Sequence, residues 1–451
     1  MQIRPIGIDL FAGAGGMSLG FEQAGFDVAA AVEIDPVHCA VHKFNFPHTA
    51  VIPRSVVGLT GAAIRLAAGI GDRTVDCVFG GPPCQGFSMI GQRALDDSRN
   101  QLVLEFVRLV VELNPKTFVF ENVKGLTVGK QKGFLDELVE AFQRGGYQVR
   151  LPWKVLNAAH YGTPQSRERL ILFGSRHDQP LPEYPPIQTS IAGRAKISDL
   201  LPVGPTCRDA LDDLPDAERF SELIENDHVH VNKGVKPSVY AAEMRCLTNN
   251  AWHLGYVRSW NPTLLTSSAR TQHSDISRQR FARTAEGAVE PISRFFKLPA
   301  DGVANTLRAG TDGARGAFTS PRPIHYRHDR CITVREMARL HGFPDWFRFN
   351  VTKWHGARQI GNAVPPPLAR EIARSICAAV GKIPHQPAGL LSLGNEELLH
   401  MDMSSASRHF NADALNGRRD RKSGTKKRKQ IDIEHDLFEV ARGAVKIAQH
   451  G

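Results

Sequence analysis

Reactive side chains adjoin three apolar, strand-like segments in the first half of this sequence. Cys84 comes after the run 75–79 and a Gly-Gly-Pro-Pro break. Glu121 comes directly after the run 117–120. Two glycines and two prolines stop both strand and helix, so we expect a rigid loop that presents the Cys84 thiol at a strand end. A single cysteine in a turn is more often a small buried residue than a nucleophile, so the neighbouring elements must decide its role.

Two further charged positions follow in the sequence Gln-Ser-Arg-Glu-Arg (165–169), which leads into another apolar run. The two-residue period of a strand puts Arg167 and Arg169 on one face and Glu168 on the other. The carboxyl ends of neighbouring parallel strands share one edge of an open sheet. We therefore expect Glu121 and Arg167 to meet Cys84 at that edge.

A glycine-rich loop precedes these segments. The sequence Leu-Phe-Ala-Gly-Ala-Gly-Gly (10–16) connects a predicted strand, 5–9, with a predicted helix, 17–24. The backbone N–H groups of such a loop can hold a nucleotide-like ligand. Glu33 ends the next predicted strand, where an acid can bind the ribose hydroxyls of an adenosine-type cofactor. The loop does not read Gly-x-Gly-x-x-Gly, so a nucleoside cofactor is favoured over a dinucleotide.

Alternating strands and helices predict the fold class and the domains. Residues 1–180 are typical of an α/β domain with a Rossmann-like, doubly wound and mostly parallel sheet. Residues 181–330 lose this periodicity and predict a smaller, loop-rich domain. Residues 331–382 return to helical patterns and should complete the first domain, whereas 383–451 predict a flexible basic tail. Individual helices or strands are expected at 101–113, 117–120, 134–142, 149–156, 333–341 and 368–380.

Composition and charge exclude several classes of protein. The sequence has 42% apolar residues and no apolar run near the ~20 residues of a membrane span, and it begins with no signal peptide. Seven scattered cysteines without a Cys-x-x-Cys pair argue for a reducing cytosol and against a structural zinc site. The net charge of +10 comes mostly from 418–429, with eight basic residues and one acid. The segment 245–330 has thirteen bases against six acids, which suits a phosphate-rich partner.

Taken together, these segments resemble the DNA cytosine-5 methyltransferase family, whose members are class I methyltransferases that use S-adenosylmethionine. The resemblance covers roughly residues 5–380, and the motifs occur in the family's order. The matching positions are Asp-Leu-Phe-Ala-Gly-Ala-Gly-Gly (9–16), Glu33, Gly-Pro-Pro-Cys-Gln (81–85), Glu-Asn-Val (121–123), Gln-Ser-Arg-Glu-Arg (165–169), Thr-Val-Arg-Glu (333–336) with Ala-Arg (338–339), and Gly-Asn (361–362).

The resemblance implies that Cys84 is the nucleophile. Cytosine C5 is a poor nucleophile, but a thiolate that adds at C6 converts the ring to an enamine that reacts through C5. By its motif, Glu121 should protonate or hydrogen-bond the N3 edge of the base, which requires a raised pKa. Arg167 should reach the O2 side of the ring. Arg169 belongs to the same catalytic motif, and the resemblance implies that it supports the other catalytic residues structurally.

The resemblance also implies S-adenosylmethionine as cofactor, S-adenosylhomocysteine as product, and no metal. The positions that match its pocket are Phe11, Ala12, Gly13, Gly15, Glu33, Ile34, Leu102 and Asn362. Between Glu33 and Cys84 the family usually has an acid that contacts the adenine amino group. Here Arg-Ser-Val (54–56) occupies that region, so Ser55 must substitute or the contact is lost.

By position, 181–330 corresponds to the family's target-recognition domain, which implies duplex DNA with a flipped-out cytosine. Thr306 and Leu307 resemble the short Thr-Leu signature that begins the recognition loops; the Thr-Leu pair at 263–264 has the wrong spacing to Thr333. Arginines after this signature suit base edges and phosphates, and Arg322 and His325 belong to the same candidate set. The residues expected to bind substrate are Gln85, Ser88, Asn122, Thr306, Arg308 and Arg315.

The resemblance favours a sequence-specific bacterial enzyme of the cytoplasm and nucleoid, acting as a monomer on DNA and paired with a restriction endonuclease. The basic run 418–429 is either a sequence-independent DNA tether or a solubilising arm. Two alternatives of the same fold are an RNA methyltransferase, which would need a smaller insert, and a non-catalytic DNA-binding protein, which would lack Cys84 or Glu121. A nicotinamide oxidoreductase is disfavoured by the glycine pattern.

Overall fold

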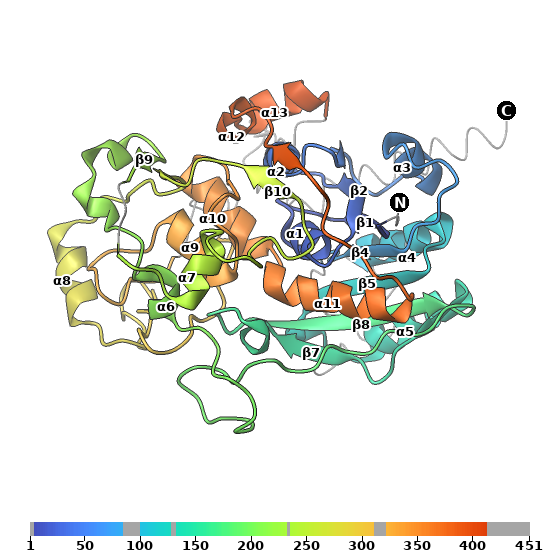
Figure 1. The fold of residues 1–451 in the computed structure, drawn as a ribbon, viewed down its shortest axis with the longest axis horizontal. Coiled ribbons are helices and arrows are strands. Elements are labelled where there is room, and N and C mark those ends of the chain that lie inside the picture. The colour runs from blue at the N-terminus through green and yellow to red at the C-terminus, as the bar shows by residue number, and fades with distance from the viewer. Residues whose placement is uncertain (1–3, 84–99, 128–131, 232–234, 311–321, 413–451) are drawn as a thin grey trace, which may run out of the picture.

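The structure is a computed structural model that describes residues 4–83, 100–127, 132–231, 235–310 and 322–412. Of the positions expected to act on DNA, Cys84, Gln85, Ser88 and Arg315 lie outside these ranges, as does the basic run 418–429. Figure 1 shows a sheet domain beside a second, loop-rich region, with the last described helices lying over the start of the chain.

An eight-stranded, mostly parallel sheet confirms the predicted fold class. Its order is β3-β2-β1-β4-β5-β8-β6, with β7 also paired to β8. The strands from β3 to β5 are parallel, and β8 runs antiparallel to β5, β6 and β7. The strands are β1 (Ile6–Leu10), β2 (Asp27–Val32), β3 (Ala50–Ile52), β4 (Cys77–Gly80), β5 (Thr117–Val123), β6 (Tyr147–Val149), β7 (Lys154–Asn157) and β8 (Glu168–Arg176).

The carboxyl ends of the four central strands are level. Leu10 at the end of β1 pairs with Val32 on β2 and with Gly80 on β4. Gly80 in turn pairs with Phe120 on β5. The cofactor-type loop, Glu33, the Gly-Pro-Pro loop and Glu121 therefore start from one edge of the sheet, which is where open α/β sheets bind ligands.

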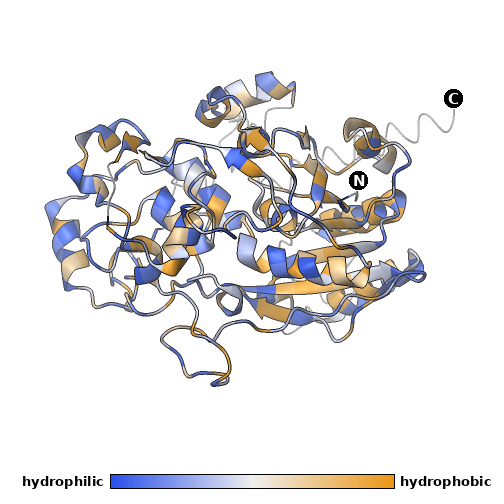
Figure 2. Ribbon diagram, in the orientation of Figure 1, coloured by the Kyte–Doolittle hydropathy of each residue, from blue (hydrophilic) through white to orange (hydrophobic). Residues whose placement is uncertain are grey.

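Helices cover both faces of the sheet, whose strands form the apolar centre of the domain in Figure 2. Phe106 and Phe142 pack on one face, where the Phe142 and Phe118 rings stack with centroids 3.9 Å apart. On the other face, Phe21 and Leu368 pack against Phe79 and Ile171. The helices of this domain are α1 (Gly16–Gln23), α2 (Pro36–Asn45), α3 (Gly61–Ala67), α4 (Gln101–Leu113), α5 (Lys132–Arg144), α9 (Val334–His341), α10 (Lys353–Asn362) and α11 (Pro366–Ala379), with 3-10 turns η3 (Lys124–Thr127) and η5 (Ala158–Tyr161).

Short elements and loops make up the region between residues 181 and 330. It packs on α9 through a second apolar core that also includes Leu19 and Phe46 of the sheet domain. Arg258 on β10 reaches α1, where its guanidinium pairs with the Glu22 carboxylate at 2.6 Å. The elements are α6 (Cys207–Leu211), α7 (Val239–Met244), α8 (Asp275–Arg283), β9 (Val229–His230), β10 (Val257–Ser259) and β11 (Leu264–Leu265), with 3-10 turns η6 (Ala217–Arg219) and η7 (Ser221–Ile224).

Two expectations about elements are wrong. The segment 149–156 is not one strand, because β6 and β7 are separated by a turn that contains Pro152, which cannot donate to a strand ladder. The chain after residue 382 does not become a flexible tail at once. It forms β12 (Leu390–Ser392), α12 (Glu397–His400) and α13 (Met403–Phe410), which bury Leu398 and Leu399 against α2.

Candidate active site

Glu121 lies near the end of β5 with only 9% of its surface exposed. Arg169 on the neighbouring strand β8 places its Nε 2.8 Å from Glu121 Oε1. Burial raises the pKa of the Glu121 carboxyl, and the charges of Arg169 and Arg167 only partly oppose this. Glu121 is therefore a buried carboxyl that takes up a proton more readily than an exposed one, beside a fixed cation.

The loop that leads to Cys84 is fixed against Glu121 and β1. Asn122 Nδ2 donates to the carbonyl of Pro82 at 3.0 Å. A Cβ on Gly81 would lie 2.2 Å from Glu121 Oε2, and one on Gly80 would lie 2.0 Å from the Leu10 carbonyl oxygen. Only glycine fits at either place. The Gly-Gly-Pro-Pro sequence thus brings Gly81 against the carboxyl of Glu121, and Asn122 holds this loop at Pro82.

Arg169, and not Arg167, forms the 2.8 Å ion pair with Glu121, although the Arg167 charge also acts on the Glu121 carboxyl. The Arg167 guanidinium donates to the carbonyls of Leu307 at 2.9 Å and Gly361 at 2.7 Å. Its side chain is buried, and burial lowers its pKa well below the usual range, with Arg169 adding to the effect. Arg167 therefore joins its own segment to the distant segments at Leu307 and Gly361.

The Thr-Leu signature docks on the same segment. Thr306 Oγ1 donates to the Ser166 carbonyl at 2.8 Å, and Leu307 N donates to Gln165 Oε1 at 3.1 Å. Arg308 is exposed, and its carbonyl carbon would lie 2.4 Å from a Cβ on Gly361. Gly361 is thus needed for the close approach of the recognition segment.

Two other candidates for reading DNA are buried in the protein. Arg322 donates to the Ile332 carbonyl at 2.9 Å, and the His325 side chain lies near Glu336. Both are below a tenth exposed. The expectation that they contact DNA is therefore wrong, since an arginine-rich stretch does not reveal which arginines point inward.

The glycine-rich loop curls around an acid. Glu33 accepts hydrogen bonds from Gly13 N and Asp35 N, both at 2.8 Å. Phe11, Gly13 and Gly15 have positive φ angles of 63°, 55° and 99°, the last two easily adopted by glycine. A Cβ on Gly13 would meet no atom within 4 Å, so open space faces the loop. The Glu33 carboxylate and the open side of the loop at Gly13 together fit a nucleoside, whose ribose hydroxyls can bind the carboxylate.

The remaining pocket positions surround this loop. Phe11 and Leu102 are partly buried on the same apolar core, and Ile34 is half-buried next to Glu33. Asn362 ends α10, and the two residues after it cross the loop: a Cβ on Gly16 would lie 2.5 Å from the Val364 carbonyl oxygen. Ser55 accepts a hydrogen bond from Val57 N at 3.1 Å, which leaves its hydroxyl hydrogen free to donate.

A buried polar network under the loop was not predicted from the sequence. Ser18 donates to Asp9 Oδ2 at 2.6 Å and lies 3.0 Å from His42 Nε2. Burial raises the pKa of Asp9 to about 8 despite the Ser18 hydrogen bond, and burial lowers the pKa of His42 to about 3. Asp9, Ser18 and His42 are far apart in the sequence and form no recognisable motif. Their contact depends on α2, which carries His42 and was not predicted.

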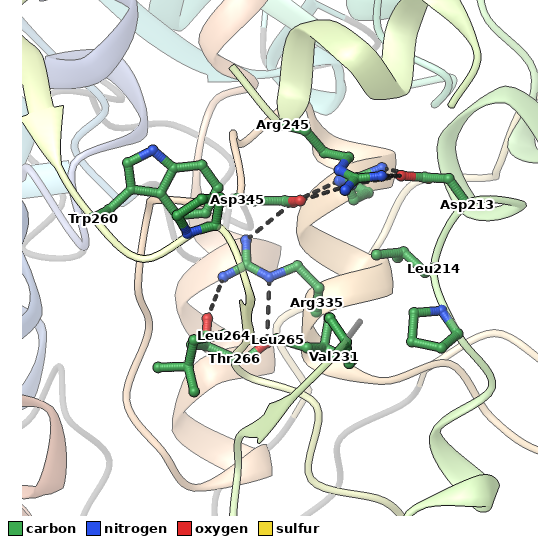
Figure 3. Close-up of a pocket in the computed structure, with 13 residues that line it drawn as sticks. Asp213, Leu214, Val231, Arg245, Trp260, Leu264, Leu265, Thr266, Arg335 and Asp345 are labelled. Atoms are coloured by element: carbon green, nitrogen blue, oxygen red, sulfur yellow. Dashed lines mark hydrogen bonds and ion pairs between the residues drawn. The ribbon is translucent and has the colours of Figure 1, made fainter. Parts of the chain in front are cut away.

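A cavity in the second region, shown in Figure 3, does not contain these groups. Trp260 and Leu264 line it together with arginines that are already paired. Arg335 donates to Thr266 Oγ1 at 2.8 Å, and Arg339 binds Asp213 at 2.9 Å. The cavity therefore lies where the second region packs on α9, and its arginines are held by partners within the protein. Within the described ranges, no helix is long and apolar enough to cross a membrane, and no three His, Cys, Asp or Glu side chains are grouped to hold a metal.

Comparison with known proteins gives a consistent result. The model of the family described as C-5 cytosine-specific DNA methylase matches residues 6–378. The chain is 58% identical over 407 residues to the type II methyltransferase M.XorII of Xanthomonas oryzae pv. oryzae, covering 90% of this chain and 92% of the relative. It is 34% identical to M1.HphI of Haemophilus parahaemolyticus, covering 82% and 86%. Its fold is similar to the crystal structure of a prophage-encoded DNA modification methyltransferase of E. coli, at a TM-score of 0.65 and 34% identity, covering 84% of this chain and all of that one.

Proposed function

The chain belongs to the C-5 cytosine-specific DNA methylase family, and we propose that it methylates cytosine C5 at a specific duplex sequence through a covalent bond between Cys84 and C6. The observation that carries this proposal is the junction of Glu121, Arg169 and the Pro82 loop at one strand edge. Cys84 follows that loop directly.

When the Cys84 thiolate adds to C6, negative charge moves into the cytosine ring, and a proton delivered to N3 neutralises it. An ordinary thiol with a pKa near 8.5 is only about 3% ionised at pH 7, so the step benefits from a partner that neutralises the ring as sulfur adds. We assign this role to Glu121, because burial raises the pKa of its carboxyl and so favours the protonated form that can donate to N3. As Cys84 sulfur bonds to C6, the Glu121 proton moves to N3 and the enamine forms.

We assign the O2 side of the ring to Arg169 instead of Arg167. Arg169 contacts Glu121, so a base held by that carboxyl lies within reach of its guanidinium. Arg167 has both terminal nitrogens bound to backbone carbonyls and serves to position the segment. A fixed cation stabilises the negative charge that builds on O2 when the thiolate adds.

Bound S-adenosylmethionine would supply the methyl group. Glu33 would hold its ribose hydroxyls, with the Gly13 loop, Phe11 and Leu102 around the nucleoside. After transfer, loss of the C5 proton to a base, release of the Cys84 sulfur from C6 as a thiolate and return of the N3 proton to Glu121 restore the neutral aromatic ring. The product is S-adenosylhomocysteine.

The recognition role belongs to residues 181–330 in this proposal. A cytosine inside a duplex is unreachable, so the base must flip out of the stack. Arg308 is exposed on the segment that docks beside Arg167, which supports contact with DNA at this side. We further propose that the enzyme works as a monomer in the bacterial cytoplasm and nucleoid, partnered with a restriction endonuclease, with 418–429 as a DNA tether.

Sequencing after bisulfite treatment tests this function. DNA from cells that express the protein should contain methylated cytosines within a single short sequence. An in vitro reaction with labelled S-adenosylmethionine should transfer label to the same duplex and not to tRNA. Label in tRNA but none in duplex DNA would refute the proposal in favour of the RNA enzyme.

A further inference from the structure

Residues 390–410, here called the C-terminal strap, return to the sheet domain after the segment that matches the family model ends at residue 378. At one end, β12 pairs in parallel with β10 of the recognition region. At the other end, Leu398 and Leu399 pack on Val41 and Phe44 of α2. The same apolar cluster includes Ala14, which lies inside the glycine-rich loop.

Hydrogen bonds hold the strap both on α2 and on the segment that precedes α10. Gly394 N donates to the Phe44 carbonyl at 2.9 Å, and a Cβ on Gly394 would lie 2.9 Å from Phe44 Cα. Val351 N donates to the Leu399 carbonyl at 3.1 Å, and Asn350 Nδ2 donates to the Met401 carbonyl at 2.9 Å. A larger residue at 394 would push the two backbones apart.

The helix α2 is also linked to Glu33 and to Ser18, which lies just after the glycine-rich loop. Asp35 caps this helix by accepting from Val37 N at 2.9 Å, while its own N–H binds Glu33 Oε1. His42, further along α2, reaches Ser18 below the loop. A shift of α2 therefore moves both the Glu33 carboxylate and the support of the loop.

We propose that the C-terminal strap is a positioning element of the methyl-donor pocket, which holds α2 and Ala14 so that Glu33 and Gly13 fit an adenosyl ligand. The inference rests on the proposed use of S-adenosylmethionine. The strap touches no reacting atom and acts through α2. Interior packing is dense, so loss of a buried strap side chain is transmitted to its neighbours.

Leu399→Ala in the full-length protein tests this role. Leu399 is fully buried, so its truncation leaves a cavity against α2. We expect the dissociation constant for S-adenosylhomocysteine, measured by calorimetry, to rise about tenfold. The KM for S-adenosylmethionine should rise in parallel, and the KM for DNA should stay unchanged. Leu399→Met should restore most of the affinity.

The control is His400→Ala, which alters an exposed neighbour on the same turn and should leave affinity unchanged. If Leu399→Ala does not fold, Gly394→Ala should show the same selective loss of affinity by displacing the strap. Folded variants of both kinds with wild-type affinity for S-adenosylhomocysteine would overturn the inference. A wild-type protein that does not bind S-adenosylhomocysteine would instead overturn the proposed function.

Discussion

Buried carboxyl groups behave in opposite ways in the sheet domain and at its junction with the recognition region. Under the cofactor-type loop, burial raises the pKa of Asp9 to about 8, and at the strand edge it raises that of Glu121. At the junction, Glu336 is also buried, but two contacts from Arg330 at 2.8 and 2.9 Å outweigh burial and lower its pKa to about 2.

The difference separates two uses of a buried carboxyl. A carboxyl whose pKa is raised can carry or pass a proton near neutral pH, as acid catalysis requires. A carboxylate held by arginines stays ionised and serves to join segments, as Glu336 joins Arg330 to the N-cap of α9 at Thr333. Burial therefore sets the direction of the pKa shift at Asp9 and Glu121, whereas contacts with Arg330 set it at Glu336.

Replacement of Glu121 by glutamine should cause the largest effect. Glutamine keeps the shape but cannot give a proton to N3, so the methyl-transfer rate should fall by about 10²- to 10⁴-fold. Single-turnover kinetics with labelled S-adenosylmethionine would measure this. Glu168→Gln is the matched control, because Glu168 lies on the other face beside Arg169 and pairs with exposed Lys124. Equal losses in both variants would contradict the assignment.

Replacement of Glu336 by glutamine should act on stability. It leaves Arg330 buried without the Glu336 charge, beside Asp216 at 3.1 Å and the Cys331 carbonyl at 3.2 Å, so the free energy of unfolding should fall by about 3 kcal/mol. Because the folded pKa of Glu336 is depressed, its contribution is present above the usual pKa and is lost as pH falls toward 2. Urea denaturation would measure it. Asp301→Asn, which alters an exposed pair with Arg208, should leave stability unchanged.

Replacement of Asp9 by asparagine should show the smallest effect, with the opposite dependence on pH. The folded pKa of Asp9 is raised, so the wild-type protein loses its contribution as pH rises from about 4 through 8. The Asp9→Asn variant has no titrating group at this position, so its stability does not fall with pH for this reason. Its stability relative to wild type should increase by at most about 1.4 kcal/mol per pH unit between pH 5 and pH 7. A constant difference over this range would show that Asp9 is ionised throughout.

The order of the motifs and the alternation of strands and helices were enough to predict the fold class and Glu33 beside the glycine loop. Periodicity placed α4 correctly at 101–113 because its apolar face is regular. It could not rank Arg167 against Arg169, because tertiary contacts distinguish them: Arg167 donates to the Leu307 and Gly361 carbonyls, whereas Arg169 pairs with Glu121.

Other features depend on contacts between distant segments. The C-terminal strap is about as apolar as the whole chain, with nine apolar residues of twenty-one, so its composition does not mark it out. Its position depends on Leu398 and Leu399 packing on α2, a helix that the sequence did not predict. The same holds for Arg322 and His325, whose burial depends on the packing around α9.

The central claim is a covalent bond between Cys84 and cytosine C6, and trapping with 5-fluorocytosine tests it most directly. The duplex would carry the analogue at the cytosine that bisulfite sequencing identifies. Fluorine at C5 cannot leave as the proton does, so elimination should stop with sulfur still bonded to C6. Mass spectrometry should then find the modified nucleotide on the peptide that contains Cys84, and only when S-adenosylmethionine is present. Methylation of normal DNA by Cys84→Ala, or an adduct on another residue, would contradict the account.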